Sequence, residues 1–522
     1  MTAGIEGRRA QQMQQLDGAT VDVLIIGGGI NGAVSAAALA GHDVSVAVVD
    51  RGDFAGFTSQ ESSNLIWGGF KYLQTYEFGL VRKLSQARNR LLDAYPSSVT
   101  PINFLAVFDD QAPFPPWLVT IGSFAYWAIG NFETKGPRPL KNAAIKELEP
   151  AINTSRVKGG LLYADAYLED NDARFVFGFV RRAVDSGAIA ANYAEVTSVE
   201  FNTDADHPWT AEITDRTTSQ RYTMQARAIV NATGPFLDEM NRSLDVRTKH
   251  RIAHSKGIHL VVPQIGTGER VFAFFDEDER LYYVIPMDGR SVIGTTDTRV
   301  DSPFTEVTSQ DRAFVLRQVN ARLDLPTPIA ESDIISERCG VRPLVVEAGG
   351  ANDDQADWLQ LSRRHEIEAS HERKVLSIFG GKLTDCLNVG EEIVELIGDF
   401  GIRPKPLHED WFGEPSAAAR AEFLRTANAA GIGRSLPGDA SILWRRYGTK
   451  AAEVLERIVA EPDLVWDGPP YHRGELAYIG EHELVVHLDD FLRRRSGLSL
   501  TETPDALAES RAEMARILGV KV

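Results

Sequence analysis

The most constraining feature of this sequence is a glycine-rich stretch close to its start, residues 22–50, which reads DVLIIGGGINGAVSAAALAGHDVSVAVVD. The apolar run 23–26 predicts a strand buried on both faces, 33–40 predicts a helix of small residues, and 44–49 predicts a second strand. Gly27, Gly29 and Gly32 form G-x-G-x-x-G, which permits a tight turn and close approach of a pyrophosphate, while Asp50 can accept hydrogen bonds from ribose hydroxyls. The complete order predicts a dinucleotide site and leaves FAD and NAD open.

Length, charge and cysteine content exclude several classes of protein. A chain of 522 residues predicts two to four domains, and 55 basic against 73 acidic residues give a net charge of −18. Such a chain is a poor candidate for binding nucleic acid. Cys339 and Cys386 form no zinc or CxxC pattern, so we expect no disulfide and a reducing, cytoplasmic location. The histidines form no metal-binding motif and G-x-S-x-G is absent, so we expect neither a metal site nor a nucleophile elbow.

No segment predicts a signal peptide or a membrane span. The first twenty residues lack an apolar core, and no apolar run reaches about twenty residues. The nearest approach is 115–132, PPWLVTIGSFAYWAIGNF, which is short and interrupted by glycine. This segment predicts a packed helix, with peripheral membrane contact as the alternative.

Later segments return to the same nucleotide. We find no second βαβ fingerprint for NAD, but three apolar strands end in glycine or hydroxyl residues: 226–240 at Ala232, Thr233 and Gly234, 290–298 at Thr295 to Asp297, and 375–397 at the Gly380-Gly381 turn. The helix after that last turn aims its N-terminal dipole at the loop. Several segments converging on one ligand suit FAD, whose length requires contacts beyond the first βαβ unit.

The stretch 65–73, LIWGGFKYL, places two glycines between a tryptophan and a Phe-Lys-Tyr run. Glycine weakens regular structure, so a Gly-Gly pair indicates a special backbone angle or a close neighbour. Gly68 and Gly69 therefore predict that something lies close to this backbone.

Taken together, the motifs resemble the FAD-dependent glycerol-3-phosphate dehydrogenases of the glycine and D-amino-acid oxidase-like flavoprotein group. The pieces that carry the resemblance are DVLIIGGGINGA, TSQESSNLIWGGFKYLQ, DNDARFVFGFVRRAVDSGA, IVNATGPFLD, SKGIHLVVP, YYVIPMDGRSVIGTTDT, GVRPL and FGGKLTDC. The likeness extends through RRYGTKAAEVL and ELAYIGEHELVVHLDDFLRRR, and so covers residues 22–497.

The resemblance implies a map of the site. The expected FAD contacts are Gly27, Gly28, Gly29, Asn31, Gly32, Asp50, Arg51, Thr58, Ser59, Ser62, Ser63, Asn64, Trp67, Gly68, Gly69, Ala232, Thr233, Gly234, Gly381, Lys382, Leu383 and Thr384. The expected substrate contacts are Lys71, Tyr72, Thr295, Arg342 and Lys382, with Arg342 and Lys382 facing the anionic end and His259 taking the hydroxyl proton. Gly68 and Gly69 would then lie beside the flavin.

Two positions depart from the family pattern. Trp67 stands where the family has histidine, and Lys71 stands where it has arginine. Tryptophan cannot titrate, and lysine keeps the charge but loses the bidentate fork that arginine offers a phosphate. A changed substrate is therefore an alternative.

The resemblance implies FAD-dependent oxidation of sn-glycerol 3-phosphate to dihydroxyacetone phosphate by hydride transfer to flavin N5, with electrons passed to a quinone or another acceptor. The alternatives are a flavin oxidoreductase for another small anionic hydroxy acid or amine, and a catalytically impaired flavoprotein that binds or regulates a partner. A homodimer and a peripheral position at the inner membrane face remain open.

We expect an α/β fold in which a Rossmann-like FAD domain comes from 21–105, 160–250 and 330–400. A mixed-sheet substrate domain should come from 106–159 and 251–329, and a helical domain from 401–522. Residues 1–20 should form a flexible N-terminus.

Overall fold

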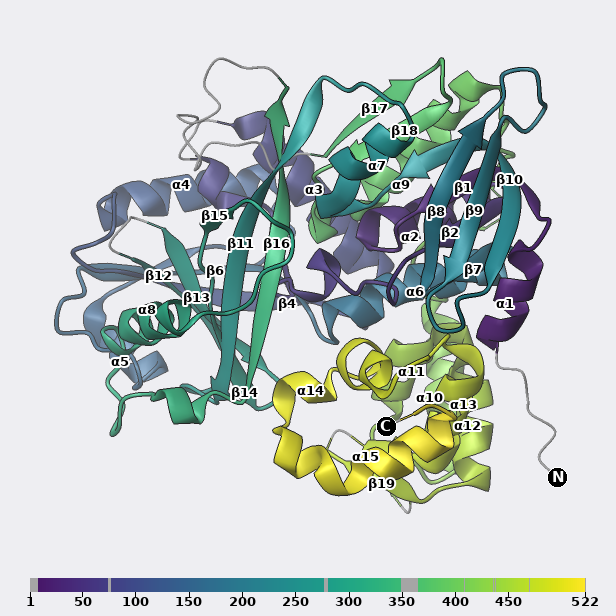
Figure 1. Ribbon diagram of the computed structural model, residues 1–522. Coiled ribbons are helices and arrows are strands. Elements are labelled where there is room, and N and C mark those ends of the chain that lie inside the picture. Colours follow the sequence, from purple (N-terminus) through teal and green to yellow (C-terminus); the bar gives the residue numbers. More distant parts are fainter. Residues whose placement is uncertain are drawn as a thin grey trace.

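The computed structural model describes residues 8–73, 77–276, 280–348, 365–407, 409–434, 436, 438–468 and 470–521. Figure 1 shows a sheet covered by helices at the upper right, a second sheet at the left, and a helical region below them. The fold is the expected combination of a Rossmann-like FAD domain, a mixed-sheet domain and a C-terminal helical domain.

The first sheet is built around the glycine-rich unit. Its strands run in the order β17-β18-β10-β1-β2-β7, and β9 pairs with both β10 and β8. β1 is parallel to β2 and β10, as the buried apolar run predicts. The strands are β1 (Thr20–Ile26), β2 (Val46–Val49), β7 (Ile189–Ala191), β8 (Ala194–Phe201), β9 (Trp209–Asp215), β10 (Arg221–Asn231), β17 (Glu366–Ser370) and β18 (Val375–Phe379).

Helices cover both faces of this sheet. Small residues of α2 (Ile30–Gly41) allow close packing on β1 and against α6 (Asp172–Asp185) and α9 (Cys386–Leu396), which form one core. The other helices of this region are α1 (Arg8–Leu16), α3 (Phe78–Ala94) and α7 (Leu237–Ser243), with 3₁₀ turns at Thr58–Gln60, Phe70–Leu73, Gly234–Phe236, Leu383–Asp385 and Ile397–Phe400.

The prediction of a flexible N-terminus is wrong for residues 8–20. Met13 and Leu16 of α1 are buried, the helix packs on β7 and β10, and Arg9 forms an ion pair with Asp215 at 2.8 Å. These two apolar residues lie on one face of an otherwise polar helix, so burial on the sheet stabilises it.

The second sheet contains more of the chain than we predicted. Its order is β15-β11-β14-β13-β12-β4-β6-β3, with β16 paired to β11 and β5 paired to β6. The strands are β3 (Leu65–Ile66), β4 (Val99–Phe108), β5 (Arg138–Leu140), β6 (Gly159–Leu168), β11 (His250–Pro263), β12 (Arg270–Phe275), β13 (Leu281–Met287), β14 (Arg290–Gly294), β15 (Thr298–Val300) and β16 (Ser336–Glu347). The predicted boundaries are therefore wrong at β3, β4, β6 and β16, which pair in this sheet.

Helices α4 (Pro116–Ile129), α5 (Asn142–Leu148) and α8 (Ser309–Asn320) accompany the second sheet, with a 3₁₀ turn at Glu331–Asp333. Figure 1 shows α4 at the outer edge of this domain. None of the described helices is both long and apolar enough to span a bilayer.

The C-terminal domain has its own apolar core and joins the FAD domain through buried ion pairs. Its elements are α10 (Ala417–Ala429), α11 (Ala440–Tyr447), a 3₁₀ turn (Gly448–Lys450), α12 (Ala451–Ala460), β19 (Leu464–Asp467), β20 (Pro470–His472), α13 (Arg473–His482), a π-helix (Asp490–Arg495), α14 (Leu498–Thr501) and α15 (Pro504–Leu518). Arg495 binds the carboxylate of Asp53 through both terminal nitrogens at 2.9 Å. Because Asp53 lies just after β2, this domain braces the loop that follows the nucleotide strand.

Candidate functional site

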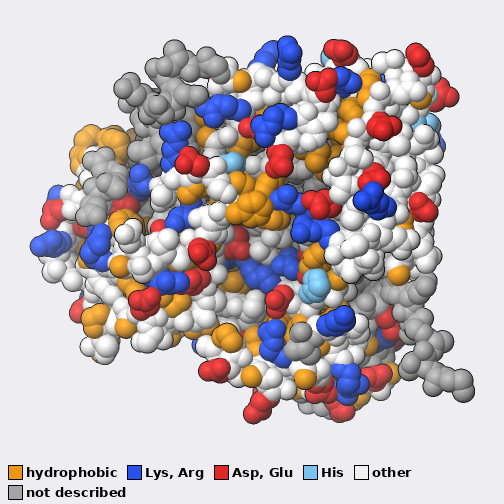
Figure 2. All heavy atoms as spheres, viewed as in Figure 1, with side chains coloured by type: hydrophobic (Ala, Val, Ile, Leu, Met, Phe, Trp, Pro, Cys, Tyr) orange, Lys and Arg blue, Asp and Glu red, His pale blue; other side chains and the backbone are white. Residues whose placement is uncertain are grey.

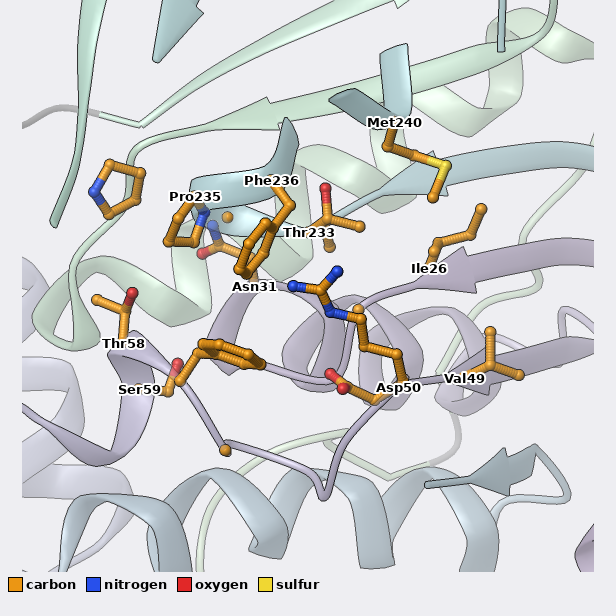
Figure 3. A pocket seen from close by; sticks show the side chains of 18 of the residues that line it. Ile26, Asn31, Val49, Asp50, Thr58, Ser59, Thr233, Pro235, Phe236 and Met240 are labelled. Carbon is orange, nitrogen blue, oxygen red and sulfur yellow. The ribbon is translucent and has the colours of Figure 1, made fainter. Parts of the chain in front are cut away.

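A cavity of about 450 Å³ opens at the carboxyl ends of β1, β2 and β10, the place where open α/β sheets bind ligands. Figure 3 shows Asp50 and Phe236 on opposite sides of this space, with Thr58 and Ser59 along one edge. The predicted cofactor residues that line it are Gly27, Gly29, Asn31, Asp50, Arg51, Thr58, Ser59, Ala232, Thr233, Gly234 and Gly381.

The glycines of the first loop separate into two roles. A Cβ at Gly32 would lie 1.8 Å from the carbonyl oxygen of Gly27, and a Cβ at Gly28 would lie 2.2 Å from the ring of Phe54. These two glycines therefore permit packing inside the protein instead of lining the cavity. Gly29 does line it, just before the first helical residue of α2, whose N–H is capped by the hydroxyl of Ser59 at 3.0 Å.

Asp50 closes the loop and retains acceptor capacity. Its carboxylate accepts hydrogen bonds from the backbone N–H groups of Gly28 at 2.7 Å and Gly52 at 2.8 Å. A carboxylate has about four lone-pair positions, so it can still accept hydroxyls of a ribose. Burial raises the pKa of Asp50 to about 6, although the two backbone hydrogen bonds oppose the rise.

Arg51 adds a cation enclosed by aromatic rings. Its guanidinium carbon lies 3.8 Å from the ring centre of Phe236, 5.4 Å from that of Phe57 and 5.7 Å from that of Phe304. One of its terminal nitrogens is buried without a hydrogen-bond partner among the described residues.

The polar groups of the cavity fit FAD. Asn31 Nδ2 donates to the carbonyl of Gly380 at 3.0 Å, which leaves the buried Oδ1 of Asn31 without a partner in the described part of the chain. Buried polar atoms are ordinarily hydrogen-bonded, so the unpaired atoms of Asn31 and Arg51 indicate a polar ligand. A helix N-terminus and free backbone donors suit its pyrophosphate, and Asp50 suits its ribose.

Two predicted nucleotide contacts have structural roles. The backbone N–H of Ser62 donates to Asp172 at 2.8 Å, and Asn64 Nδ2 donates to the carbonyl of Asp170 at 2.8 Å. Asn64 Oδ1 accepts from Arg338 at 3.3 Å. Ser62 and Asn64 thus fix the chain around Ser63 to β6, α6 and β16, and their contact with the nucleotide stays a prediction.

Lys382 and Tyr72 lie together beside the cavity. Lys382 Nζ donates to the Tyr72 hydroxyl at 2.7 Å, and it directly follows Gly381, which lines the cavity. The rings of Trp67 and Tyr72 are 6.1 Å apart, and Thr384 Oγ1, next to Leu383, lies 3.5 Å from the carbonyl oxygen of Trp67. The structure therefore brings together the predicted residues of two distant segments. The side chain of Lys71 lies outside the described part of the structure.

Arg342 and Thr295 form a second pair. Arg342 Nη2 donates to Thr295 Oγ1 at 2.7 Å, and Nη1 donates to the carbonyl of Thr296 at 3.1 Å. Arg342 directly precedes Pro343, another residue that lines the cavity. The chain neighbours of the two cationic residues, Pro343 for Arg342 and Gly381 for Lys382, therefore line the cofactor cavity.

His259 lies on the same face of the β11–β16 ribbon as Arg342. It pairs with Arg338 across the ribbon, four positions along β16 from Arg342. The imidazole is 3% exposed, and neither ring nitrogen has a hydrogen-bond partner among the described residues. Burial, and then the charges of Arg338 and Arg342, lower the pKa of His259 well below its ordinary value. A neutral, buried imidazole with both nitrogens unpaired indicates a missing polar partner.

Contacts within the protein explain why residues 68 and 69 are both glycine. A Cβ at Gly68 would lie 2.2 Å from the hydroxyl oxygen of Tyr126, and Gly69 has φ +88° with Leu84 and the Tyr72 ring 2.9 Å from its Cβ position. Side chains of α3, α4 and the loop itself account for both glycines. Protein packing therefore requires glycine at both positions, and the proximity of the flavin stays a prediction.

Several residues around the site were not predicted from the sequence. Phe57, Phe236 and Phe304 surround Arg51, and Arg494 and Arg495 hold Asp53. The triple arginine in FLRRR was a visible signal, since such residues are seldom buried without a carboxylate partner. Across the described residues, no group of three or more His, Cys, Asp or Glu side chains could hold a metal ion.

Comparison with known proteins agrees with this geometry. Residues 22–366 match the family model described as FAD dependent oxidoreductase, and 417–521 match the C-terminal domain of alpha-glycerophosphate oxidase. The aerobic glycerol-3-phosphate dehydrogenase of Escherichia coli is 31% identical over 493 residues, covering 91% of this chain and 94% of that protein. The enzyme of the same name from Bacillus subtilis is 30% identical, covering 94% and 89%.

A solved structure shows the same fold. The glycerol-3-phosphate dehydrogenase from Bacillus halodurans complexed with FAD superposes with a TM-score of 0.71 at 23% identity, covering 98% of this chain and 97% of that one. The cavity, its acidic residue and the matched models lead to one conclusion: this chain is an FAD-dependent oxidoreductase and belongs to the glycerol-3-phosphate dehydrogenase family.

Proposed function

We propose that the protein oxidises sn-glycerol 3-phosphate to dihydroxyacetone phosphate with FAD bound in the β1–β2–β10 cavity. The observation that supports this proposal is that Pro343 and Gly381, the chain neighbours of Arg342 and Lys382, line that cavity, with a neutral histidine near Arg342. The names of the relatives at about 30% identity support the same substrate. FAD, when bound, supplies the redox chemistry by accepting the hydride at N5.

The two cations would bind the phosphate. Arg342 can present two parallel N–H donors, while Lys382 offers a point charge held in place by Tyr72. Thr295 positions the guanidinium and can itself contact a hydroxyl of the substrate. Binding a dianion here would also place negative charge next to His259.

His259 would accept the hydroxyl proton. A neutral imidazole has one acceptor nitrogen, and burial with adjacent cations keeps His259 neutral in the absence of substrate. A bound phosphate would offset the charge of Arg342 and so raise the pKa of His259 toward that of a useful base. Trp67 cannot share this role because indole has no titratable nitrogen in this range.

A panel of substrates tests the assignment. The purified protein is assayed with a soluble dye as electron acceptor against sn-glycerol 3-phosphate, glycerol, glycerol 2-phosphate, glycolate and glycine. We expect turnover only with sn-glycerol 3-phosphate. A preference for glycolate or glycine would favour the alternative of another small hydroxy acid or amine. No turnover of any compound by FAD-loaded protein would favour a binding or regulatory role.

We further propose that electrons pass to a quinone and that α4 contacts the surface of a lipid bilayer. Trp117 is 64% exposed and Ile121 is 58% exposed, and no charged residue stands between Asp110 and Glu133. Figure 2 shows hydrophobic side chains gathered at this edge of the molecule. At about 21 Å, α4 is too short to cross a hydrocarbon core of about 30 Å, so it would lie in the interface.

Flotation with phosphatidylcholine vesicles tests this contact. We expect the protein to float, and the double variant Trp117→Ser, Ile121→Ser to remain in the dense fraction with its soluble-dye activity intact. Uncharged lipid is chosen because a chain of net charge −18 gains nothing from anionic headgroups. A dimer in solution that the same double variant dissociates would show that a second copy, and not lipid, covers this helix.

A further inference from the structure

A fully buried carboxylate connects α4 to the stretch that carries Gly68. Asp165 of β6 is 0% exposed, and its oxygens accept from Tyr126 Oη at 2.8 Å and from Arg88 Nη1 at 3.0 Å. The backbone N–H of Gly68 also points at this carboxylate, 3.2 Å from Oδ2 and 3.3 Å from Oδ1. Asp165 thus joins three segments: α3 through Arg88, α4 through Tyr126, and the loop after β3 through Gly68.

Gly68 lies so close to the hydroxyl of Tyr126 that no side chain fits between them. A Cβ at Gly68 would lie 2.2 Å from the Tyr126 hydroxyl oxygen, and 3.1 Å from both Arg88 Nη1 and Ser85 Oγ. The Tyr126 ring also packs edge to face on Phe70, with ring centres 5.4 Å apart. Tight packing of this kind transmits displacement, since interiors have little free volume.

A second contact with α3 fixes the C-terminal end of α4. Asn89 Nδ2 donates to the carbonyl of Gly130, at the end of α4, at 3.0 Å, and Asn89 Oδ1 accepts from Arg88 Nε at 3.0 Å. The outer face of α4 carries the exposed Trp117 and Ile121, whereas Tyr126 is 3% exposed. Tyr126 is therefore the side chain by which this helix reaches the interior next to Gly68.

We propose that Tyr126, acting through the carboxylate of Asp165, is a positioning residue for the 67–72 segment beside the cofactor cavity. This inference rests on the proposed function, in which Tyr72 holds Lys382, one of the two cations that would bind the phosphate. Tyr126 touches neither cofactor nor substrate. The Tyr126 hydroxyl donates to Asp165 and so orients its carboxylate. That carboxylate accepts from the N–H of Gly68, and the backbone between Gly68 and Tyr72 then positions the Tyr72 hydroxyl at Lys382.

The first test compares two buried tyrosines in the FAD-loaded protein. Tyr126→Phe removes the bond to Asp165, whereas Tyr282→Phe removes a bond to the carbonyl of Gln318 at 2.9 Å in the same domain. We expect similar small losses of thermal stability from both. Only Tyr126→Phe should change the visible circular dichroism of the flavin and slow its reduction by glycerol 3-phosphate, by about tenfold, because small misplacements at a reacting centre are costly. Unchanged dichroism in Tyr126→Phe would overturn the proposal.

A double-variant cycle provides the second test and remains informative if one variant folds poorly. Gly68→Ala should lower FAD occupancy, because its methyl group collides with the Tyr126 oxygen. Adding Tyr126→Phe removes that oxygen and should restore part of the occupancy. If the fractional FAD occupancy of the double variant equals the product of the fractional occupancies of the two single variants, the two sites act independently, which would contradict the proposal. Dichroism and occupancy require no substrate, so either result stands even if glycerol 3-phosphate proves inert.

Discussion

Replacing Gly257 by alanine should damage substrate binding by moving Arg342 without changing its chemistry. Gly257 lies in β11, and a Cβ built there would be 2.2 Å from Arg342 Nη2 and 2.5 Å from Cζ. Ordinary contact begins at 3.4 Å, so the guanidinium must move by about 1.2 Å. The end of an arginine side chain can make that shift, and we therefore expect little change in fold stability.

The shift should appear in the kinetics with glycerol 3-phosphate. Moving the guanidinium weakens its bond to Thr295 and spoils its alignment with the phosphate. A charged hydrogen bond contributes about 1.5–3 kcal/mol, which corresponds to about a 10- to 100-fold rise in KM. The value of kcat should fall much less, because the phosphate is held equally before and during the hydride transfer.

Gly178→Ala is the matched control, since it also adds one methyl group to a glycine of a regular element, in α6. There the new Cβ meets no atom within 4 Å outside its own helix, so stability should hold or rise and KM should not change. A Gly257→Ala protein with normal KM and unchanged flavin content would refute the role of Arg342 at the phosphate. A lower melting temperature with normal KM would instead assign Arg342 a purely structural role.

Three other predictions follow from the same site and its supports. Arg342→Ala should reduce kcat/KM for the phosphorylated substrate more than Lys71→Arg, which restores a fork and should be neutral or helpful; the reverse order in steady-state kinetics would contradict this map. His259→Ala should cut the rate of flavin reduction by about 10²-fold or more, whereas Trp67→His should leave the pH–rate profile nearly unaltered. Burial alone would raise the pKa of Asp53, but Arg495 and Arg494 hold that pKa below its ordinary value. This carboxylate therefore stabilises the fold above about pH 4, and the stabilisation is lost as the pH falls further. In thermal melts, Asp53→Asn should lower the free energy of unfolding by about 3–5 kcal/mol at pH 7 and make it less sensitive to acid.

The nucleotide unit could be predicted from the sequence because its signals are local. The apolar strand before Gly27, the small residues of α2 and the acid at Asp50 all lie within thirty positions, and each type is required at its place by sterics or hydrogen bonding. The roles of Arg342 and Lys382 came from family resemblance and stay predictions, although their chain neighbours Pro343 and Gly381 line the cavity.

The remaining features depend on contacts that are distant in sequence. The sequence patterns of β4 and β16 fit a strand in either sheet. Only their pairing, of β4 with β12 and of β16 with β11, assigns them to the second sheet. The neighbour of Gly68 is Tyr126, in a helix whose apolar sequence predicts packing or lipid contact but not which residue turns inward. Similarly, Asp53 and Arg495 are separated by most of the chain, so the FLRRR run indicates a carboxylate partner but nothing near it in the sequence identifies Asp53.

Anaerobic titration of the FAD-loaded protein with sn-glycerol 3-phosphate tests most directly whether this cavity oxidises a polyol phosphate. Oxygen and added acceptors are absent, so the flavin is the only oxidant and the loss of its absorbance reports its single reduction by the substrate. We expect the oxidised flavin band to disappear with an equimolar amount of substrate, with dihydroxyacetone phosphate as the product, and to disappear far more slowly in His259→Ala. A band that persists in the unmodified protein, yet bleaches with another small anionic hydroxy acid or amine, would contradict the assignment of glycerol 3-phosphate.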